Sequence, residues 1–312
     1  MPMTDPKKQP HSDPWADLSP DELTAELVKL LDVRPAGENL FRGRRKPGGV
    51  GRVYGGQVVA QALVAASKTV AEDRLVHSLH CYFLRGGSED YEIDFRVEND
   101  FDGGSFSNRR VIAMQQGEVI LNLAASFSRS GRGHHHQKQI PIVLPPEELE
   151  PIHAVALRHE SALPKKMGNF FKRASPVELR SVGDPPFILT DNKAPNLVFW
   201  FRVASELDAP QWMHRAVVAY ASDIAMIAAA AKPHQPFDMQ PASLDHSLWF
   251  HRDVRCDEWL LNVIDSPWAG EGRGLSHATI YDRDGNAVAS AAQEGIMRDR
   301  AMREMTGSDP GT

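Results

Sequence analysis

The sequence has few of the features that mark secreted, membrane-spanning or nucleic-acid-binding proteins. Only two cysteines, Cys81 and Cys256, occur in 312 residues, each in or beside an apolar run, so we expect buried reduced thiols in a cytoplasmic protein. The longest apolar stretch, 216–231, is interrupted by Ser222 and Asp223 and falls short of the roughly 20 residues of a membrane span. The net charge of −6 disfavours nucleic acid as a partner.

Targeting signals are also missing from the chain ends. The N-terminal lysines lead into no apolar segment, so we expect no signal peptide, and the last four residues are not a peroxisomal signal. The hydrophobic fraction of 42% and the charged fraction of 24% are instead typical of a soluble globular protein. A chain of this length can form two cores of ordinary size.

A weak internal repeat supports the division into two parts. Residues 77–85 and 244–252 both end in an aromatic residue, Phe, any residue and Arg, at an offset of 167 residues. The segments 112–124 and 280–292 match at an offset of 168 residues, each with a glycine turn. The second copy has Asp245 and Gln293 where the first has Ser78 and Ala125. Polar groups added to one copy of a duplicated scaffold suggest a catalytic site in that copy.

The first part has the pattern of a helix followed by an antiparallel sheet. After a disordered tail over 1–14, Ser19 and Glu22 form a predicted capping box at the start of a helix. Gly55 and Gly56 open a second helix that extends to about residue 71, and four strands follow at 76–84, 91–99, 107–114 and 119–127. We assign this part to residues 15–130.

A proline-rich segment separates this part from a second one with the same plan. Nine of the 22 prolines lie between residues 129 and 195, and we assign 131–195 as a linker that can contain short helices. The second part, 196–300, is predicted to contain a strand at 196–203, an apolar helix at 212–231, and strands at 243–251, 259–265, 275–281 and 287–296, followed by a tail at 301–312. Three adjacent histidines at 134–136 suit a solvated loop better than a metal site.

Three polar side chains of the second part are candidates for catalysis. Asp245 lies in one predicted strand, Ser266 ends the next before Pro267, and Gln293 lies in the last. Neighbouring strands can bring a carboxylate, a hydroxyl and an amide around one water, with Asp245 as general base. Taken singly, each residue is more often a solvated, turn or sheet-edge group. No Gly-x-Ser-x-Gly motif indicates a serine hydrolase.

Several ordered motifs carry a resemblance to a known family. They include, in the first part, Leu40-Phe41-Arg42-Gly43, Tyr54-Gly55-Gly56-Gln57 and Tyr82-Phe83-Leu84-Arg85, and in the second part Leu244-Asp245-His246-Ser247, Ser266-Pro267-Trp268 and Gln293-Glu294-Gly295. From about residue 30 to residue 298 the chain resembles the acyl-CoA thioesterase II family. The resemblance implies an α+β double hotdog, with two fused repeats whose antiparallel sheets each wrap a long helix. It also implies that Asp245, Ser266 and Gln293 activate water.

Other roles follow with less support from the residues. Backbone N–H groups of Gly56 and Gln57 at a helix start are candidate donors to the oxyanion, with close helix–sheet packing as the equally weighted alternative. Arg109 and Arg110 are candidate contacts for the phosphates of coenzyme A. Asp223, a carboxylate inside an apolar helix, is a rival for the base, although a structural role is preferred.

The sequence therefore predicts hydrolysis of fatty acyl-CoA by direct attack of water, without metal or cofactor. We expect acyl-CoA as the substrate, no nucleic acid or membrane-spanning partner, and a cytoplasmic homo-oligomer. A hotdog enoyl-CoA hydratase or dehydratase, for which Asp245 and His251 would serve, is one alternative. A non-catalytic acyl-CoA-binding protein is the other.

Overall fold

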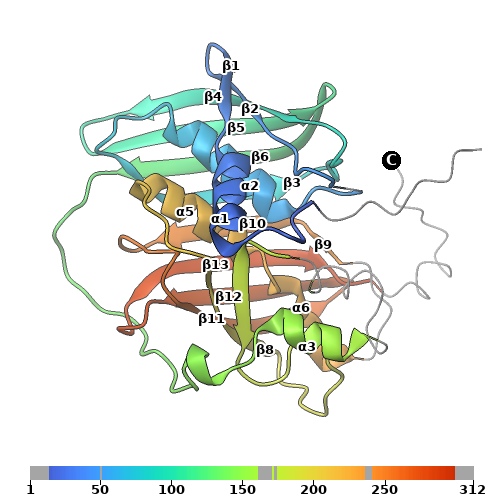
Figure 1. The fold of residues 1–312 in the computed structure, drawn as a ribbon. Coiled ribbons are helices and arrows are strands. Elements are labelled where there is room, and N and C mark those ends of the chain that lie inside the picture. The colour runs from blue at the N-terminus through green and yellow to red at the C-terminus, as the bar shows by residue number, and fades with distance from the viewer. Residues whose placement is uncertain (1–13, 50, 161–170, 172–173, 236–240, 299–312) are drawn as a thin grey trace, which may run out of the picture.

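The computed structural model describes residues 14–49, 51–160, 171, 174–235 and 241–298. The predicted tails and part of the linker lie largely outside these residues. The described chain forms one antiparallel sheet with the main helices on one side of it (Figure 1). We call the face of the sheet that packs on these helices the inner face. The elements divide into two halves that meet at the middle of the sheet.

The first half has two helices and six strands. Helix α1 begins with the predicted capping box, in which the Glu22 N–H donates to Ser19 Oγ (3.3 Å) and the Ser19 N–H donates to Glu22 Oε2 (2.8 Å). Helix α2 begins at Gly55, and because nearly all of its residues are buried it fills the centre of this half. The elements are α1 (Pro20–Leu31), β1 (Arg34–Gly37), β2 (Leu40–Gly43), α2 (Gly55–Ser67), β3 (Leu75–Phe83), β4 (Ile93–Asp102), β5 (Phe106–Gln115) and β6 (Glu118–Ser128).

The second half repeats this arrangement with one change in its helix. The predicted helix over 212–231 is two helices, α5 (Gln211–Ser222) and α6 (Met226–Ala231), because the chain turns at Asp223 and Ala225 takes a left-handed conformation (φ 66°). The remaining elements are η1 (Pro146–Glu148), α3 (Ile152–Arg158), β7 (Val177–Ser181), β8 (Asn196–Val203), η3 (Lys232–His234), β9 (Ala242–Ser243), β10 (Asp245–Phe250), β11 (Leu260–Gly270), β12 (Arg273–Tyr281) and β13 (Ala287–Ile296).

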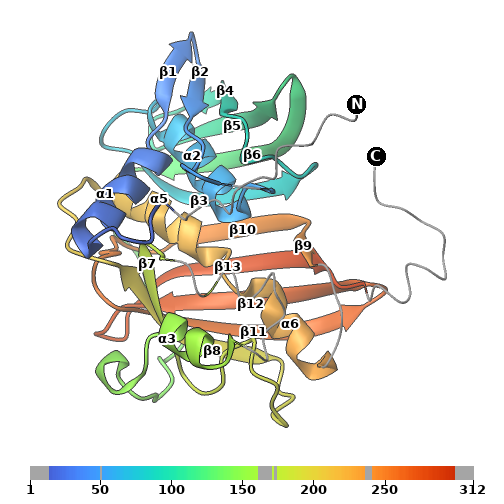
Figure 2. The same cartoon turned by 45° about the vertical axis from the view of Figure 1, so that its right-hand side comes forward.

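The two halves join through strands β3 and β10. The strand order is β1-β2-β4-β5-β6-β3-β10-β13-β12-β11-β8-β7, with β9 paired to β13, so hydrogen bonds run without a break from one half to the other. His80 lies opposite Ser247 where the two strands pair, and His80 Nδ1 is 3.0 Å from Ser247 Oγ. These residues are 167 positions apart, which is the offset of the sequence repeat. Figure 2 shows β3 and β10 side by side where the two halves meet.

Several strand predictions required correction. The predicted strand 243–251 is divided into β9 and β10 by an irregular residue, Leu244. Ser266 does not end its strand, because β11 continues to Gly270 after a bulge between Asp265 and Trp268. Strand β7 and helix α3 lie within the segment predicted as a linker, and β7 pairs with β8.

The apolar segment Gln211–His234 is long enough, by length and composition alone, to cross a membrane. However, 67% of its most apolar window is buried inside the protein. It spans α5, the turn at Asp223, α6 and η3. Its apolar character is thus accounted for by packing in the core.

Candidate functional site

A buried chain of polar side chains lies on the inner face of the second half. The Gln293 amide is at its centre, where Oε1 lies 2.6 Å from His246 Nδ1 and Nε2 donates to Ser243 Oγ at 2.9 Å. On the other side of the imidazole, His246 Nε2 lies 2.8 Å from Ser222 Oγ at the end of α5. Both His246 and Gln293 are almost fully buried. Since an unpaired buried amide is costly, these bonds fix the orientation of the Gln293 amide.

Asp223 connects this chain to the first half. Its Oδ1 accepts a hydrogen bond from Ser243 Oγ at 3.4 Å, and its Oδ2 accepts one from the Gly56 N–H at 2.9 Å. Gly56 lies in the first turn of α2, where unpaired N–H groups and the helix dipole stabilise a negative charge. Nearby, the Tyr54 hydroxyl donates to the Tyr220 carbonyl at 2.9 Å. The start of α2 therefore faces the second half.

Burial and the two carboxylates determine the electrostatics of this region. Burial lowers the pKa of the His246 imidazole, although Asp223, the hydrogen bond with Gln293 and Asp245 each oppose this shift. Burial also raises the pKa of the Cys81 thiol, and the charges of Asp223 and Asp245 add to that increase. The carboxylates of Asp223 and Asp245 thus both act on His246 and Cys81, which are opposite one another in the β3–β10 pair.

The pKa of His246 gives the protein a predicted pH dependence of stability. In the unfolded chain an imidazole titrates near pH 6.5, whereas the folded protein keeps His246 neutral to lower pH. The contribution of neutral His246 to the free energy of unfolding is therefore complete above about pH 6.5. It is lost as pH falls below this value, with a slope of up to about 1.4 kcal/mol per pH unit. Thermal unfolding between pH 8 and pH 5 should show a shallower decline for His246→Gln than for the wild type.

A control for this prediction is His136→Gln, which removes an exposed imidazole. That variant should follow the wild-type pH dependence. Equal slopes for the wild type and His246→Gln would show that His246 does not couple folding to pH.

Asp245 lies next to this chain at the start of β10. Its Oδ1 accepts a hydrogen bond of 2.7 Å from the backbone N–H of Glu294, the residue after Gln293. This bond fixes the position of the carboxylate against β13. Among the described residues, Oδ2 of Asp245 has no hydrogen-bond donor. That oxygen is suited to accept a proton from a bound water.

Ser266 of β11 and Gln293 of β13 lie on the inner face, in strands that are separated by β12. Gln293 is opposite Ser276 in the β12–β13 pair, and Ser266 lies beyond Ser276 at the bulge of β11. The Ser266 hydroxyl donates to the Leu275 carbonyl at 2.6 Å, so its oxygen is left to accept a hydrogen bond. No hydrogen bond joins Asp245, Ser266 and Gln293 directly within the described part of the chain.

The predicted oxyanion donors have partners inside the protein. The Gly56 N–H is bonded to Asp223, and the Gln57 N–H is bonded to the Tyr54 carbonyl at 3.1 Å. A Cβ atom on Gly56 would lie 2.3 Å from the Tyr220 carbonyl oxygen, so the close approach of the two halves requires glycine there. This geometry accounts for Gly56 through packing, and its role as an oxyanion donor stays a prediction.

Comparison with known proteins decides the family. A family model for the N-terminal domain of acyl-CoA thioesterases matches residues 43–128, and one for the C-terminal domain matches residues 146–297. The chain belongs to the acyl-CoA thioesterase family. It is a thioester hydrolase, as the sequence predicted.

Relatives and solved structures agree with this assignment. The chain is 39% identical over 290 residues to acyl-coenzyme A thioesterase 8 of Homo sapiens, covering 89% of this chain and 91% of the relative. It is similar to the crystal structure of an acyl-CoA thioesterase II from Mycobacterium marinum, with 36% identity, a TM-score of 0.73 and coverage of 88% and 98%. A hotdog-fold protein from Alicyclobacillus acidocaldarius, at 17% identity and a TM-score of 0.69 over 86% and 97% of the chains, shows the same fold. The thioesterase thus has a hotdog fold.

The arginines predicted to bind coenzyme A have other partners in this thioesterase. Arg109 is 2% exposed, and its guanidinium is bonded to Asp102 (2.9 and 3.0 Å) and to Thr69 at the end of α2. This placement argues against a contact between Arg109 and a substrate phosphate. Arg110 is exposed on the opposite face, paired with Glu98 (2.6 Å) and Asp100 (3.2 Å), and its contact with phosphate stays a prediction. No group of His, Cys, Asp or Glu that could hold a metal occurs among the described residues.

The sequence analysis missed three members of the buried chain, Ser222, Ser243 and His246. The repeat contained the signal that could have identified them, because every member has an apolar or glycine counterpart in the first half. At an offset of 167 or 168 residues the pairs are Ser222 with Gly55, Asp223 with Gly56, Ser243 with Val76, His246 with Leu79, and Gln293 with Ala125. The thioesterase therefore has this polar chain in one half only.

Proposed function

We propose that this chain hydrolyses fatty acyl-CoA to the free acid and coenzyme A by direct attack of water, on a scaffold of two fused hotdog repeats. The observation that carries the proposal is the buried polar chain around Gln293, which occurs only in the second half of a member of the acyl-CoA thioesterase family. The proposal that the acyl group is a fatty acid rests on the family resemblance. Thiol release from acyl-CoAs of different chain lengths tests this part of the proposal.

In the proposed reaction, Asp245 takes a proton from a water through Oδ2 while Oδ1 is held by the Glu294 N–H. The Ser266 oxygen accepts a hydrogen bond from the same water, since its own proton is donated to the Leu275 carbonyl. The amide of Gln293, oriented by His246, orders the attacking oxygen. The water oxygen attacks the thioester carbon, the C–S bond breaks, and the proton passes to the thiolate of coenzyme A.

The competing hydratase reaction is separated by one experiment. We expect release of free thiol from a saturated acyl-CoA. We expect no hydration of an enoyl-CoA, which would be detected as a loss of enoyl absorbance without thiol release. His251, which the hydratase would need, is exposed and lies 2.8 Å from Ser290 Oγ. Hydration without thiol release would overturn the proposal, and binding without either reaction would favour an acyl-CoA-binding protein.

The homo-oligomer and the cytoplasmic location that the sequence indicates stay predictions.

A further inference from the structure

The turn between α5 and α6 lies between the polar chain and two adjoining cavities, which together we call the passage. We propose that the acyl chain of the substrate enters this passage at Ile224 and Ala225 and extends beneath α3 toward the surface. The inference rests on the proposed hydrolysis of acyl-CoA and adds the site that holds the acyl group. It also assigns a role to α3 and β7, which the sequence analysis placed in a linker.

The passage begins beside Asp223. While the Asp223 carboxylate points to Gly56 and Ser243, the next two residues line a small cavity of about 10 Å³ on the other side of the turn. The left-handed conformation of Ala225 interrupts the helix there, so its backbone does not close the opening. A single apolar cavity thus lies next to the only helix break in the described part of α5–α6.

The opposite wall of this cavity is close to Ser266. Leu197 and Phe199 of β8 line the cavity, and Leu197 is the partner of Ile264, two residues before Ser266. The Ser266 N–H also donates to the Pro195 carbonyl at 2.7 Å, two residues before Leu197. The cavity is therefore flanked by Asp223 on the helix side and by Ser266 on the sheet side, which is where the acyl end of a thioester would lie.

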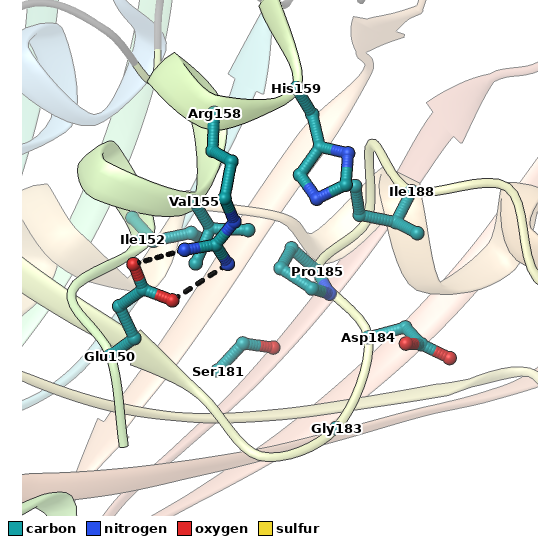
Figure 3. A pocket seen from close by; sticks show the side chains of 10 residues that line it. All are labelled: Glu150, Ile152, Val155, Arg158, His159, Ser181, Gly183, Asp184, Pro185 and Ile188. Atoms are coloured by element: carbon teal, nitrogen blue, oxygen red, sulfur yellow. Dashed lines mark hydrogen bonds and ion pairs between the residues drawn. The ribbon is translucent and has the colours of Figure 1, made fainter. Parts of the chain in front are cut away.

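A second, larger cavity adjoins the smaller one. It measures about 380 Å³ and shares Ile152 and Ser181 with the smaller one. Figure 3 shows Val155, Pro185 and Ile188 as its apolar walls. These residues come from α3 and from the loop that follows β7.

The ion pair at this cavity calls for no charged ligand, although His159 and Asp184 also line the cavity. Arg158 is paired with Glu150 through two hydrogen bonds of 2.6 and 2.7 Å, shown as dashed lines in Figure 3. The pair keeps both charges satisfied at the rim, so neither calls for a charged ligand. Hydrocarbon is the occupant that gains most from the apolar walls, because each buried methylene raises binding by about fourfold. Ile152 and Ser181, which line both cavities and which we call the junction, would then limit how far the chain extends.

Substitutions at that junction test the proposal. Ile152→Trp, at a buried side chain, and Ser181→Phe, at a half-buried one, each fill the junction from a different element. Leu157→Trp is the matched control, because Leu157 lies on the same helix but is 53% exposed and lines neither cavity. The measurement is kcat/KM for thiol release from lauroyl-CoA and from butyryl-CoA, together with the thermal unfolding midpoint.

We expect both junction variants to lose activity on lauroyl-CoA relative to butyryl-CoA. Displacing two or three methylenes lowers that ratio by about 16- to 64-fold, whereas Leu157→Trp should keep the wild-type ratio. The two junction variants differ in burial, so Ser181→Phe keeps the test valid if Ile152→Trp does not fold. An unchanged ratio in a folded, active junction variant would overturn the passage and leave the hydrolysis intact. Absence of thiol release from both substrates by the wild type would instead overturn the proposed function.

Discussion

Replacing Asp245 with asparagine should lower kcat for acyl-CoA hydrolysis by about 10²- to 10⁴-fold, the usual contribution of a general base. The amide oxygen of asparagine can still accept the Glu294 N–H, so the backbone contact and the fold should be kept. The amide cannot take the proton from water, and KM should change little. Thiol release under saturating acyl-CoA measures the effect.

The matched control is Asp265→Asn, which removes an exposed carboxylate from β11 of the same sheet. Its activity should equal that of the wild type. Activity that survives in Asp245→Asn would exclude Asp245 as the base, and Asp223 would then be the next residue to substitute, because it is the other carboxylate that acts on His246.

Replacing Gln293 with leucine should lower kcat by about 10²- to 10³-fold, because one preorganised polar group is lost from the site. The side chain keeps its approximate volume, but His246 Nδ1 and Ser243 Oγ each lose a buried partner. We therefore expect a further loss of about 1–3 kcal/mol in the free energy of unfolding. Steady-state kinetics and denaturant unfolding would measure the two effects separately.

Gln137→Leu provides the comparison for the stability effect. Gln137 also bridges two groups, donating to the Gly285 carbonyl at 2.7 Å and accepting the Ala287 N–H at 3.1 Å, but it lies in the segment between the halves. This variant should lose stability while keeping kcat. If Gln293→Leu lost only stability, as this control does, the amide would have no part in catalysis.

Local patterns in the sequence were sufficient to predict much of the fold. Strands β8 and β13 have the predicted bounds, 196–203 and 287–296, because alternating apolar residues and flanking turns define strands within a few residues. The capping box of α1 likewise depends on two residues three positions apart. The short strands β1, β2 and β7 were missed, since β1 and β2 have only four residues each and β7 has five residues in a proline-rich segment.

The features that shape the site depend on contacts between distant parts of the chain. The turn after α5 puts an alanine in the left-handed region, which nothing in a run of apolar residues indicates. The bulge at Ser266 and the irregular Leu244 reset the alternation from which side-chain directions were inferred. The contact between His246 and Gln293 joins residues of two strands that are 47 positions apart in the chain, so no local pattern predicts it.

Fusion of the two halves has a consequence for how this protein can evolve. In a dimer of identical chains, a carboxylate at the position of Asp223 would also occur at its symmetry mate, and the two charges would meet across the axis. Here the mate is Gly56, whose N–H accommodates the charge. A single covalent chain permits this pairing of unlike residues at equivalent sites. The molecule thus has one such carboxylate instead of two, and each half can accept substitutions that the other could not tolerate.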